Sequence, residues 1–375
     1  MKDLNRYRGC LIGGAAGDAL GYPVEFMKYS EIKKRFGSDG ITEYVLDKGL
    51  ARISDDTQMT LFTATGILHG ETRGCIRGIM GDPWSYVWLS YKDWYRTQTE
   101  KYPLDGYHYS WLDDVPGLYC RRAPGNTCLS VLSVGREGSV DNPINDSKGC
   151  GGVMRVAPIG LYFGEKKHYS IEMADQIGAE AAALTHGHPL GYITAEGLVH
   201  IIALLSHNDI SIEEAVSDMK NVIYNKYAQT QHEAVDVFLE LIDKAIELAT
   251  DKHIPSDEGI ISLGEGWVAE EALAISIFCS IRYSSDFEKA IITAVNHDGD
   301  SDSTGAITGN IIGSHLGLSA IPERFIKHLE FKDLIIEIAD DLFHDCRIGD
   351  YIDEKDPEWE DKYFHNKIPS GRHFK

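Results

Sequence analysis

The sequence predicts an all-α protein. Apolar and small residues recur at helical spacing over eight stretches, whereas strand-like alternation is brief, for example at residues 41–45. No repeat of fixed period and no Pro- or Ser-rich linker divides the chain. Long helices joined by short turns indicate helix-on-helix packing, and 375 residues fit one large domain or two ordinary ones. The expected helices are residues 171–186, 191–205, 212–227, 231–249, 267–283, 286–295, 304–316 and 331–343.

Residues 81–119 are rich in aromatic side chains. Trp84, Trp88 and Tyr91 fall at i, i+4 and i+7, which predicts the buried face of a further helix. The other interpretation is a base-stacking platform, and the acidity of the chain argues against it.

The first of the eight stretches shows the helical pattern most clearly. Ile171, Ala174, Ile177, Gly178 and Ala181 lie on one face of residues 171–186. Small residues on that face predict close packing against neighbouring helices. From about residue 345 the composition turns polar and irregular, which predicts a tail (346–375) on the surface of the domain.

Charge restricts the classes of partner. Lys and Arg number 36 against 58 Asp and Glu, which gives a net charge of −22. Nucleic acids and anionic membranes require clustered Lys and Arg, so neither is expected as a partner. Hydrophobic residues make up 43% of the chain and charged residues 25%, as in ordinary globular proteins, so the chain is able to bury a core.

The cysteines and the apolar segments bear on the compartment. Seven scattered Cys without a CxxC pair predict free thiols in a reducing compartment. No apolar run approaches the roughly 18 residues of a membrane span, since His200 interrupts residues 197–205. Asp18 breaks the apolar stretch near the N-terminus too early for a signal peptide. We therefore expect a cytoplasmic protein.

Two acidic motifs could carry chemistry. In residues 53–61, Asp55 and Asp56 follow Ser54 at the start of a helical stripe, where an N-cap and two first-turn acids already have a structural explanation. In residues 297–305, Asp298, Asp300 and Asp302 place three carboxylates within five positions. A cap gains only about 0.3–1 kcal/mol from each acid, and like charges repel, so the second motif exceeds what a cap needs.

A cation would remove that repulsion. The donors are carboxylate and hydroxyl oxygens, which favours Mg²⁺, Mn²⁺ or Ca²⁺ over structural Zn²⁺. An EF-hand loop is excluded, because Ser303 and Gly309 stand where that loop requires Gly and Glu. If the two motifs converge, they could hold a pair of hard ions that bind a diol and polarise a water. The candidate ligands are Ser54, Asp55, Asp56, Asp300, Asp302 and Ser303.

Three Gly-rich loops, at residues 13–21, 123–127 and 147–155, fit neither GxGxxG nor GxxxxGK[ST]. They could form backbone nests for an anion, or they could allow close helix packing. His186 and His188 lie beside a helix end, where a cap or structural role is the commoner one. With no GxSxG motif and no local cue that activates Cys150, covalent catalysis by Ser or Cys has little support.

In order along the chain, these segments resemble the ADP-ribosylglycohydrolase family, which includes the dinitrogenase reductase-activating glycohydrolase and the ADP-ribosylarginine hydrolases. The resemblance spans roughly residues 5 to 345 and implies one helical domain, 1–345, with a dinuclear Mg²⁺ or Mn²⁺ centre in a cleft, followed by the polar tail 346–375. The matching strings are GCLIGGAAGDALGYPVEF at 9–26, SDDTQMTLFTATGIL at 54–68, RRAPGNTCLSVL at 121–132, SKGCGGVMRVAPIGL at 147–161, ALTHGHPLGYITAEGLVHII at 183–202, LGEGWVAEEALAISIFC at 263–279 and AVNHDGDSDSTGAITGNIIGSHLG at 294–317.

Site residues carried over from the resemblance fall into three groups. The six oxygen-bearing residues named above match metal ligands, and Glu25 matches a glutamate on a mobile loop over the metals. Asp55, Asp56 and Glu25 are the expected catalytic residues. The positions expected to bind the ligand are Gly125, Asn126, Gly149, Cys150, Gly151, Gly152, His186 and Trp267.

The resemblance implies a metal-dependent hydrolase that removes ADP-ribose from modified protein side chains. SDDT and GDSDST are more similar to the arginine-directed members than to the serine-directed ones, whose second motif tends to read DTDT, so N-linked ADP-ribosylarginine is the expected substrate. The implied partners are an ADP-ribosylated protein and a cognate ADP-ribosyltransferase. The alternatives are another ADP-ribose linkage (serine, a small molecule or a nucleic acid), or a binding protein that blocks a transferase.

Overall fold

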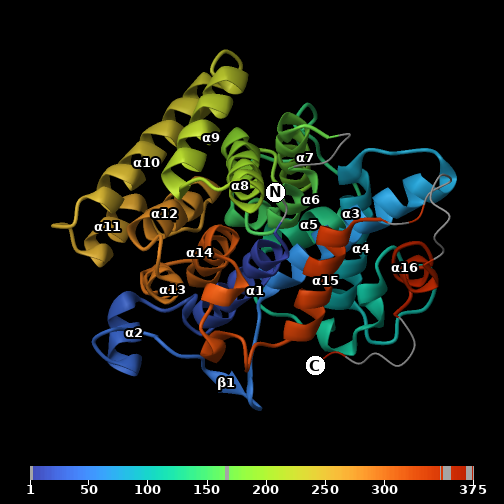
Figure 1. Ribbon diagram of the computed structural model, residues 1–375, viewed down its shortest axis with the longest axis horizontal. Helices are drawn as coiled ribbons and strands as arrows, with labels where there is room; N and C mark the ends of the chain where they lie inside the picture. Colours follow the sequence, from blue (N-terminus) through green and yellow to red (C-terminus); the bar gives the residue numbers. More distant parts are fainter. Residues whose placement is uncertain (1–2, 165–168, 347, 349–355, 369–373, 375) are drawn as a thin grey trace.

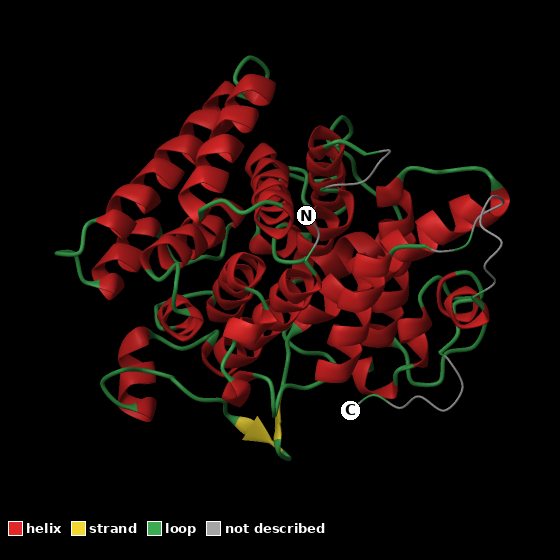
Figure 2. Ribbon diagram, viewed as in Figure 1, coloured by secondary structure: helices red, strands yellow, loops and turns green. Residues whose placement is uncertain are grey.

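The computed structural model describes residues 3–164, 169–346, 348, 356–368 and 374, and it is built almost entirely from helices (Figures 1 and 2). The α-helices are α1 (Leu4–Gly21), α2 (Tyr29–Phe36), α3 (Asp55–Arg77), α4 (Pro83–Thr99), α5 (Asn126–Val134), α6 (Ala157–Phe163), α7 (Ile171–Ala183), α8 (Pro189–His207), α9 (Ile212–Tyr227), α10 (His232–Thr250), α11 (Ser256–Leu263), α12 (Ala269–Arg282), α13 (Phe287–Val295), α14 (Ser301–Leu316), α15 (Lys332–His344) and α16 (Pro357–Tyr363). Short 3₁₀ helices are η1 (Tyr22–Val24), η2 (Trp111–Asp114), η3 (Pro116–Leu118), η4 (Cys150–Gly152), η5 (Leu318–Ala320) and η6 (Glu323–Phe325). The prediction of one large all-α domain is confirmed, and each of the eight expected helical stretches forms a helix within a few residues of its expected bounds.

Residues 41–45, where the sequence alternates briefly, form no strand. Strand structure in the described residues is limited to a two-residue antiparallel pair, β1 (Leu46–Asp47) and β2 (Leu50–Ala51). No neighbouring strand pairs with Ile41, because the Asn296 side chain takes both of its backbone groups. Ile41 N–H donates to Asn296 Oδ1 at 2.8 Å, and Asn296 Nδ2 donates to the Ile41 carbonyl at 2.9 Å. A single amide therefore replaces a strand partner.

Helices α1 and α14 cross at the centre of the molecule in unusually close contact (Figure 1). Glycines spaced four residues apart lie on the facing sides, where Gly13 faces Gly309 and Gly17 faces Gly305. A Cβ built on Gly13 would lie 2.3 Å from the Gly309 carbonyl oxygen, and one built on Gly17 would lie 1.9 Å from the Gly305 oxygen. The two backbones therefore touch directly, and the end of α1 is held beside the beginning of α14.

This contact makes Gly17 intolerant of a side chain. We expect Gly17→Ala to lower the free energy of unfolding by about 3 kcal/mol, because a methyl group must separate two backbones. The matched control is Gly74→Ala in α3, whose added Cβ would meet only the flexible, half-exposed Met80 side chain. Urea unfolding of both variants checks the prediction. Equal stabilities of the two variants would contradict it.

Helix α8 is the core helix of the second half of the chain. It is the one helix among the described residues that is long and apolar enough to cross a membrane, with a mean hydropathy of 1.4 over its best window. The expectation that no segment reaches this length was wrong for α8, because His200 does not outweigh the flanking aliphatic residues. However, 89% of that window is buried within the protein, against α6, α7 and α9. Its apolar character is therefore explained by core packing.

The aromatic stretch forms α4, as predicted. Trp88 and Tyr91 are buried against α3, and Trp84 is half-buried. Tyr91 Oη and Thr63 Oγ1 share a hydrogen bond of 2.6 Å, which fastens α4 to α3. These rings therefore belong to the core and offer no stacking platform.

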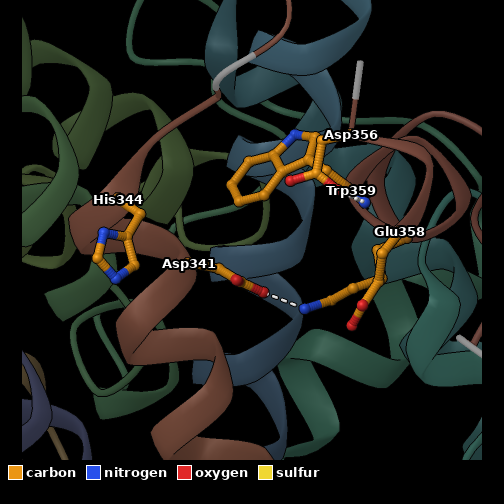
Figure 3. Close-up of a pocket in the computed structure, with 6 residues that line it drawn as sticks. Asp341, His344, Asp356, Glu358 and Trp359 are labelled. Atoms are coloured by element: carbon orange, nitrogen blue, oxygen red, sulfur yellow. Dashed lines mark hydrogen bonds and ion pairs between the residues drawn. The ribbon is translucent and has the colours of Figure 1, made fainter. Parts of the chain in front are cut away.

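Part of the polar C-terminal segment is a helix that docks on the domain. In α16, Trp359 and Tyr363 are buried, and Trp359 Nε1 donates to Thr72 Oγ1 at 2.9 Å. The buried Lys362 bridges α16 to α15 through Glu337, at 2.7 Å, and Asp341. A cavity of about 210 Å³ lies between these helices. Figure 3 shows residues that line it, with a dashed line from Asp341 to the amine of Lys362. Polar composition did not predict this docking, which depends on one buried tryptophan and one buried tyrosine.

Candidate functional site

The N-termini of α3 and α14 meet at a cleft with a cavity volume of about 320 Å³. Five carboxylates line it, and no Lys or Arg does so in the part of the chain that the structure describes. Of the predicted site residues, all except Ser54 and Gly152 line the cleft. The lining residues are Glu25, Phe26, Asp55, Asp56, Ala123, Pro124, Gly125, Asn126, Thr127, Cys128, Gly149, Cys150, Gly151, Met154, His186, Trp267, Asp300, Asp302 and Ser303.

The start of α3 is held by Asp18, which comes from α1. Ser54 caps the helix, and its Oγ accepts from Asp56 N–H at 3.2 Å. Asp18 accepts from the backbone N–H groups of Ser54, at 2.9 Å, and Thr57, at 3.1 Å, and from the Thr57 hydroxyl. A residue of α1, the helix that packs against α14, therefore fixes the start of α3, where Asp55 and Asp56 lie. The sequence signal for Asp18 was a lone acid within the Gly- and Ala-rich residues 9–21, and we did not predict its role.

The start of α14 is organised in a similar way. Asp300 is the N-cap and accepts from Ser303 N–H at 3.3 Å, while Asp300 N–H donates to the Glu265 carbonyl at 2.9 Å. The Cys150 thiol donates to Asp300 Oδ2 at 2.7 Å. Asp300 therefore caps α14 and lines the cleft at the same time. Its role as a helix cap does not exclude a role in binding a metal.

Two oxygens in the cleft are buried without a hydrogen-bond partner, Asp56 Oδ1 and Glu25 Oε2. Glu25, Asp300 and Asp302 each offer an oxygen, and these oxygens lie within 4.8 Å of one another. Unpaired buried carboxylates are costly unless a cation compensates them. An all-oxygen donor set fits Mg²⁺ or Mn²⁺, so the residues present suit a divalent cation.

Burial and mutual repulsion raise the pKa values of these acids. Burial, followed by the charges of Asp300 and Asp55, raises the pKa of Glu25 to about 9. Burial also raises the pKa of Asp18 to about 6, against the hydrogen bonds from Thr57 and Ser54. The pKa values of Asp55, Asp56 and Asp302 are likewise raised well above their usual range, chiefly by burial. Without a cation, the cleft therefore holds protons.

These shifts predict that the metal-free protein loses stability as the pH rises. Asp18 and Glu25 have ordinary pKa values of 3.8 and 4.5, so between those values and about 6 and 9 the folded state binds more protons than the unfolded state. The stabilisation is present below pH 4 and is lost as the pH rises through the folded-state values. In EDTA, we expect the contribution of the cleft to Tm to be larger at pH 5.5 than at pH 8.

A divalent cation should replace those protons. At a free Mg²⁺ concentration of 100 times Kd, we expect a gain of about 2.7 kcal/mol at pH 8 and a much smaller one at pH 5.5. Thermal melts at both pH values, with EDTA and with Mg²⁺, check this, and Asp302→Asn should lose the gain at pH 8. An equal effect of Mg²⁺ in wild type and variant would contradict the assignment.

The remaining predicted residues form the walls and the mouth. Gly125 and Asn126 lie at the start of α5, and Gly149, Cys150 and Gly151 lie on the neighbouring loop, since Thr127 Oγ1 is 3.3 Å from Ser147 Oγ. Gly152 lies behind the wall, where an added Cβ would meet Ala182 Cβ at 3.3 Å and His186 Cβ at 3.4 Å. Ser54 is buried beneath Asp56, with its Oγ at 3.3 Å from Asp56 Oδ2.

An aromatic pair lies at the mouth. The Trp267 ring, 38% exposed, stacks on the Phe26 ring, 74% exposed, with centroids 5.8 Å apart and an interplanar angle of 20°. We did not predict Phe26, although its place directly after Glu25 was the available signal.

Known proteins share this chain's sequence pattern along most of its length. A family model described as ADP-ribosylglycohydrolase matches residues 1–350. An uncharacterized protein of Archaeoglobus fulgidus is 28% identical over 343 residues, which cover 90% of this chain and 96% of the relative. ADP-ribosylhydrolase ARH3 of Mus musculus is 26% identical, covering 88% of each chain. ADP-ribosyl-[dinitrogen reductase] glycohydrolase of Rhodospirillum rubrum is 24% identical, covering 88% of this chain and 91% of the relative.

A solved structure supports the same fold. The protein, described as an ADP-ribosylglycohydrolase-related protein complex, superposes with a TM-score of 0.53 at 20% identity, over 91% of this chain and 98% of the other. The family model spans the two acidic motifs, the Gly-rich loops and His186. The chain therefore belongs to the ADP-ribosylglycohydrolase family, whose members are hydrolases that act on glycosyl bonds.

Proposed function

We propose that this protein hydrolyses the N-glycosidic bond between ADP-ribose and the arginine side chain of a modified protein, with two Mg²⁺ or Mn²⁺ ions as cofactors. The observation that carries the proposal is the convergence of two acidic helix starts on one cleft that no described Lys or Arg lines. The partner is an ADP-ribosylated protein, and a cognate transferase would supply it.

The residues proposed to hold the metals all bear oxygen. When bound, the two ions supply Lewis acidity, which polarises ribose hydroxyls and a water. The unpaired Asp56 Oδ1 is a buried base suited to orient that water and accept its proton. The proposed ligands are Ser54, Asp55, Asp56, Asp300, Asp302 and Ser303.

Glu25 is suited to move a second proton. Its Oε2 is buried without a partner, and the residue lies beneath the mouth of the cleft beside Phe26. A carboxyl whose pKa is raised by burial can donate a proton to a departing nitrogen and later take one from water. The oxocarbenium-like state formed as the bond lengthens would be stabilised by the surrounding carboxylates.

An anionic diphosphate needs donors inside this acidic protein, and backbone groups supply them. Helix α5 begins in the cleft at Asn126, and its N-cap, Gly125, has no side chain to satisfy the first N–H groups. Such a helix start attracts phosphate oxygens through its free N–H groups and its dipole. The adjoining loop carries Gly149 and Gly151, where the absence of side chains leaves room for a ligand.

The mouth suits a cationic leaving group. Phe26 and Trp267 present exposed ring surface, on which a guanidinium stacks well. Glu265 and Asp298 add exposed negative charge nearby, and both pair with the exposed Lys28, at 3.5 and 3.4 Å. An arginine-linked substrate would use this acidic, aromatic rim, whereas a serine-linked one brings no positive charge to it.

Release of free ADP-ribose tests the proposal. The protein is incubated with Mg²⁺ and with two matched peptides, one ADP-ribosylated on arginine and one on serine, with EDTA as the control. We expect release from the arginine peptide that EDTA abolishes. Release from the serine peptide alone would reassign the linkage, and release from neither, together with tight capture of a transferase, would replace hydrolysis by a binding role.

A further inference from the structure

Arg155 is a fully buried arginine directly behind the wall of the cleft, in the segment that follows η4. None of the described carboxylates accepts a hydrogen bond from it. Its guanidinium donates to the Ala181 carbonyl at 3.1 Å, to Thr185 Oγ1 at 2.7 Å and to Cys128 Sγ at 3.3 Å. Its Cζ lies 4.3 Å from the centre of the Tyr91 ring. A buried charge with only neutral partners is expensive, so its position calls for an explanation beyond packing.

Thr185 connects this guanidinium to the cleft. Its Oγ1 accepts from Arg155 and also lies 2.8 Å from Nδ1 of the adjacent His186. A guanidinium has donors only, so the Thr185 oxygen is an acceptor towards Arg155, and its own proton is free to point at Nδ1. Nδ1 of His186 is then an acceptor. In that arrangement the ring proton of the neutral histidine is on Nε2, whereas a proton on Nδ1 would leave a bare lone pair on Nε2.

Nε2 of His186 faces the ligand side of the wall. It lies 3.5 Å from the point where Gly149 would carry a Cβ and 3.3 Å from the corresponding point of Gly151. His186 lines the cleft, and no described protein group pairs with its Nε2. Burial, with a contribution from the Arg155 charge, lowers the pKa of His186 to about 3, so the ring is neutral at physiological pH. With the ring proton on Nε2, this group is a donor directed into the space left open by two glycines, as an anionic ligand requires.

We propose that Arg155 and Thr185 are positioning residues that hold His186 as its Nε2–H tautomer and so present a neutral donor, backed by a buried positive charge, to an oxygen of an anionic ligand. The inference rests on the proposed function for the identity of that ligand, ADP-ribose. This arrangement explains how an acidic cleft could bind an anion, because the positive charge of Arg155 lies directly behind the cleft wall and not in its lining. A lysine or arginine in the lining itself would instead pair with the metal-binding carboxylates.

The test uses Thr185→Val, which removes the hydroxyl and keeps the shape of the side chain. Thr185→Ser restores the hydroxyl, and Thr194→Val is the matched control, because the buried Thr194 hydroxyl makes no hydrogen bond. Long-range ¹H–¹⁵N correlation spectra of histidine-labelled protein report the tautomer of His186 without any ligand. Titration calorimetry with ADP-ribose in Mg²⁺ reports Kd.

We expect wild type, Thr185→Ser and Thr194→Val to show His186 protonated on Nε2, and Thr185→Val to lose this single tautomer. The Kd for ADP-ribose should rise about tenfold in Thr185→Val and stay within about twofold in the other two variants. An unchanged tautomer in Thr185→Val would overturn the inference. Should the wild type fail to bind ADP-ribose, the proposed function fails, and the tautomer comparison still decides the role of Thr185.

Arg155→Met tests the charge separately. It removes the guanidinium while keeping much of the side-chain volume. We expect binding of ADP-ribose to weaken at least about fivefold more than binding of adenosine, which carries no phosphate. Equal weakening for both ligands would show that Arg155 acts through packing and would overturn its electrostatic role.

Discussion

Replacing Asp56 with asparagine lowers kcat for release of ADP-ribose from an arginine-linked peptide by about 10³-fold or more, even in excess Mg²⁺. Asparagine keeps the size of the side chain but removes the charge and one of the oxygens that the cleft requires. Asp56 Oδ1 is buried and unpaired, so no protein group depends on its charge for folding. The carboxylate interacts with the hydroxyl groups of Ser54 and Ser303, which can also donate to an amide oxygen, so the helix start should persist. Initial rates at saturating peptide measure the effect.

Asp175→Asn is the matched control for Asp56→Asn. Asp175 is also a buried aspartate, but it pairs with His200 at 2.9 Å and does not line the cleft. We expect its kcat to stay within about twofold of wild type, although its Tm falls because it loses an ion pair. A variant at Asp56 that folds and retains wild-type turnover would refute the proposed metal-dependent mechanism.

Glu25→Gln produces the second large effect, a fall in kcat of about 10²- to 10³-fold with a change in Kd for ADP-ribose below about threefold. Glutamine occupies the same space beneath the mouth but cannot exchange a proton with water or with a leaving nitrogen. The two parameters separate the roles, because loss of proton transfer lowers kcat whereas loss of ligand contact raises Kd. Single-turnover rates and calorimetry measure them.

The buried Glu180 supplies the control for Glu25. Its carboxylate accepts from Val140 N–H at 3.1 Å, outside the cleft, and burial raises its pKa as well. Glu180→Gln should leave kcat and Kd within about twofold of wild type. If Glu25→Gln instead weakened ADP-ribose binding with kcat unchanged, Glu25 would be a binding residue and the proton-transfer role would be wrong.

The sequence predicted the helices because their signal is local. Residues 212–227 and 304–316 carry their apolar pattern in full, and the structure ends α9 at Tyr227 and α14 at Leu316. The two acidic motifs were equally visible, since each is a short string at a helix start. Their convergence was not visible from spacing, because Asp56 and Asp300 lie far apart in the chain. Family resemblance supplied that step, and the structure places both in one cleft.

What the sequence did not predict depends on contacts between distant residues. Asp18 acts through Ser54 and Thr57, more than 35 positions away, and nothing in its own surroundings indicates an acceptor role. The docking of α16 depends on the fit of Trp359 against α3. The unpaired charge of Arg155 becomes evident only when all its neighbours are known, because any buried arginine is expected to have a carboxylate partner.

Anomalous scattering from crystals of the protein soaked in Mn²⁺ tests the central claim most directly, since it locates the ions without reference to activity. The account predicts two manganese peaks in the cleft between the starts of α3 and α14, each within about 2.5 Å of carboxylate oxygens of Asp55, Asp56, Asp300 or Asp302. Asp56→Asn crystals should lose at least one of the two peaks. A cleft without manganese at saturating Mn²⁺, in crystals whose cleft is open to solvent, would contradict the account.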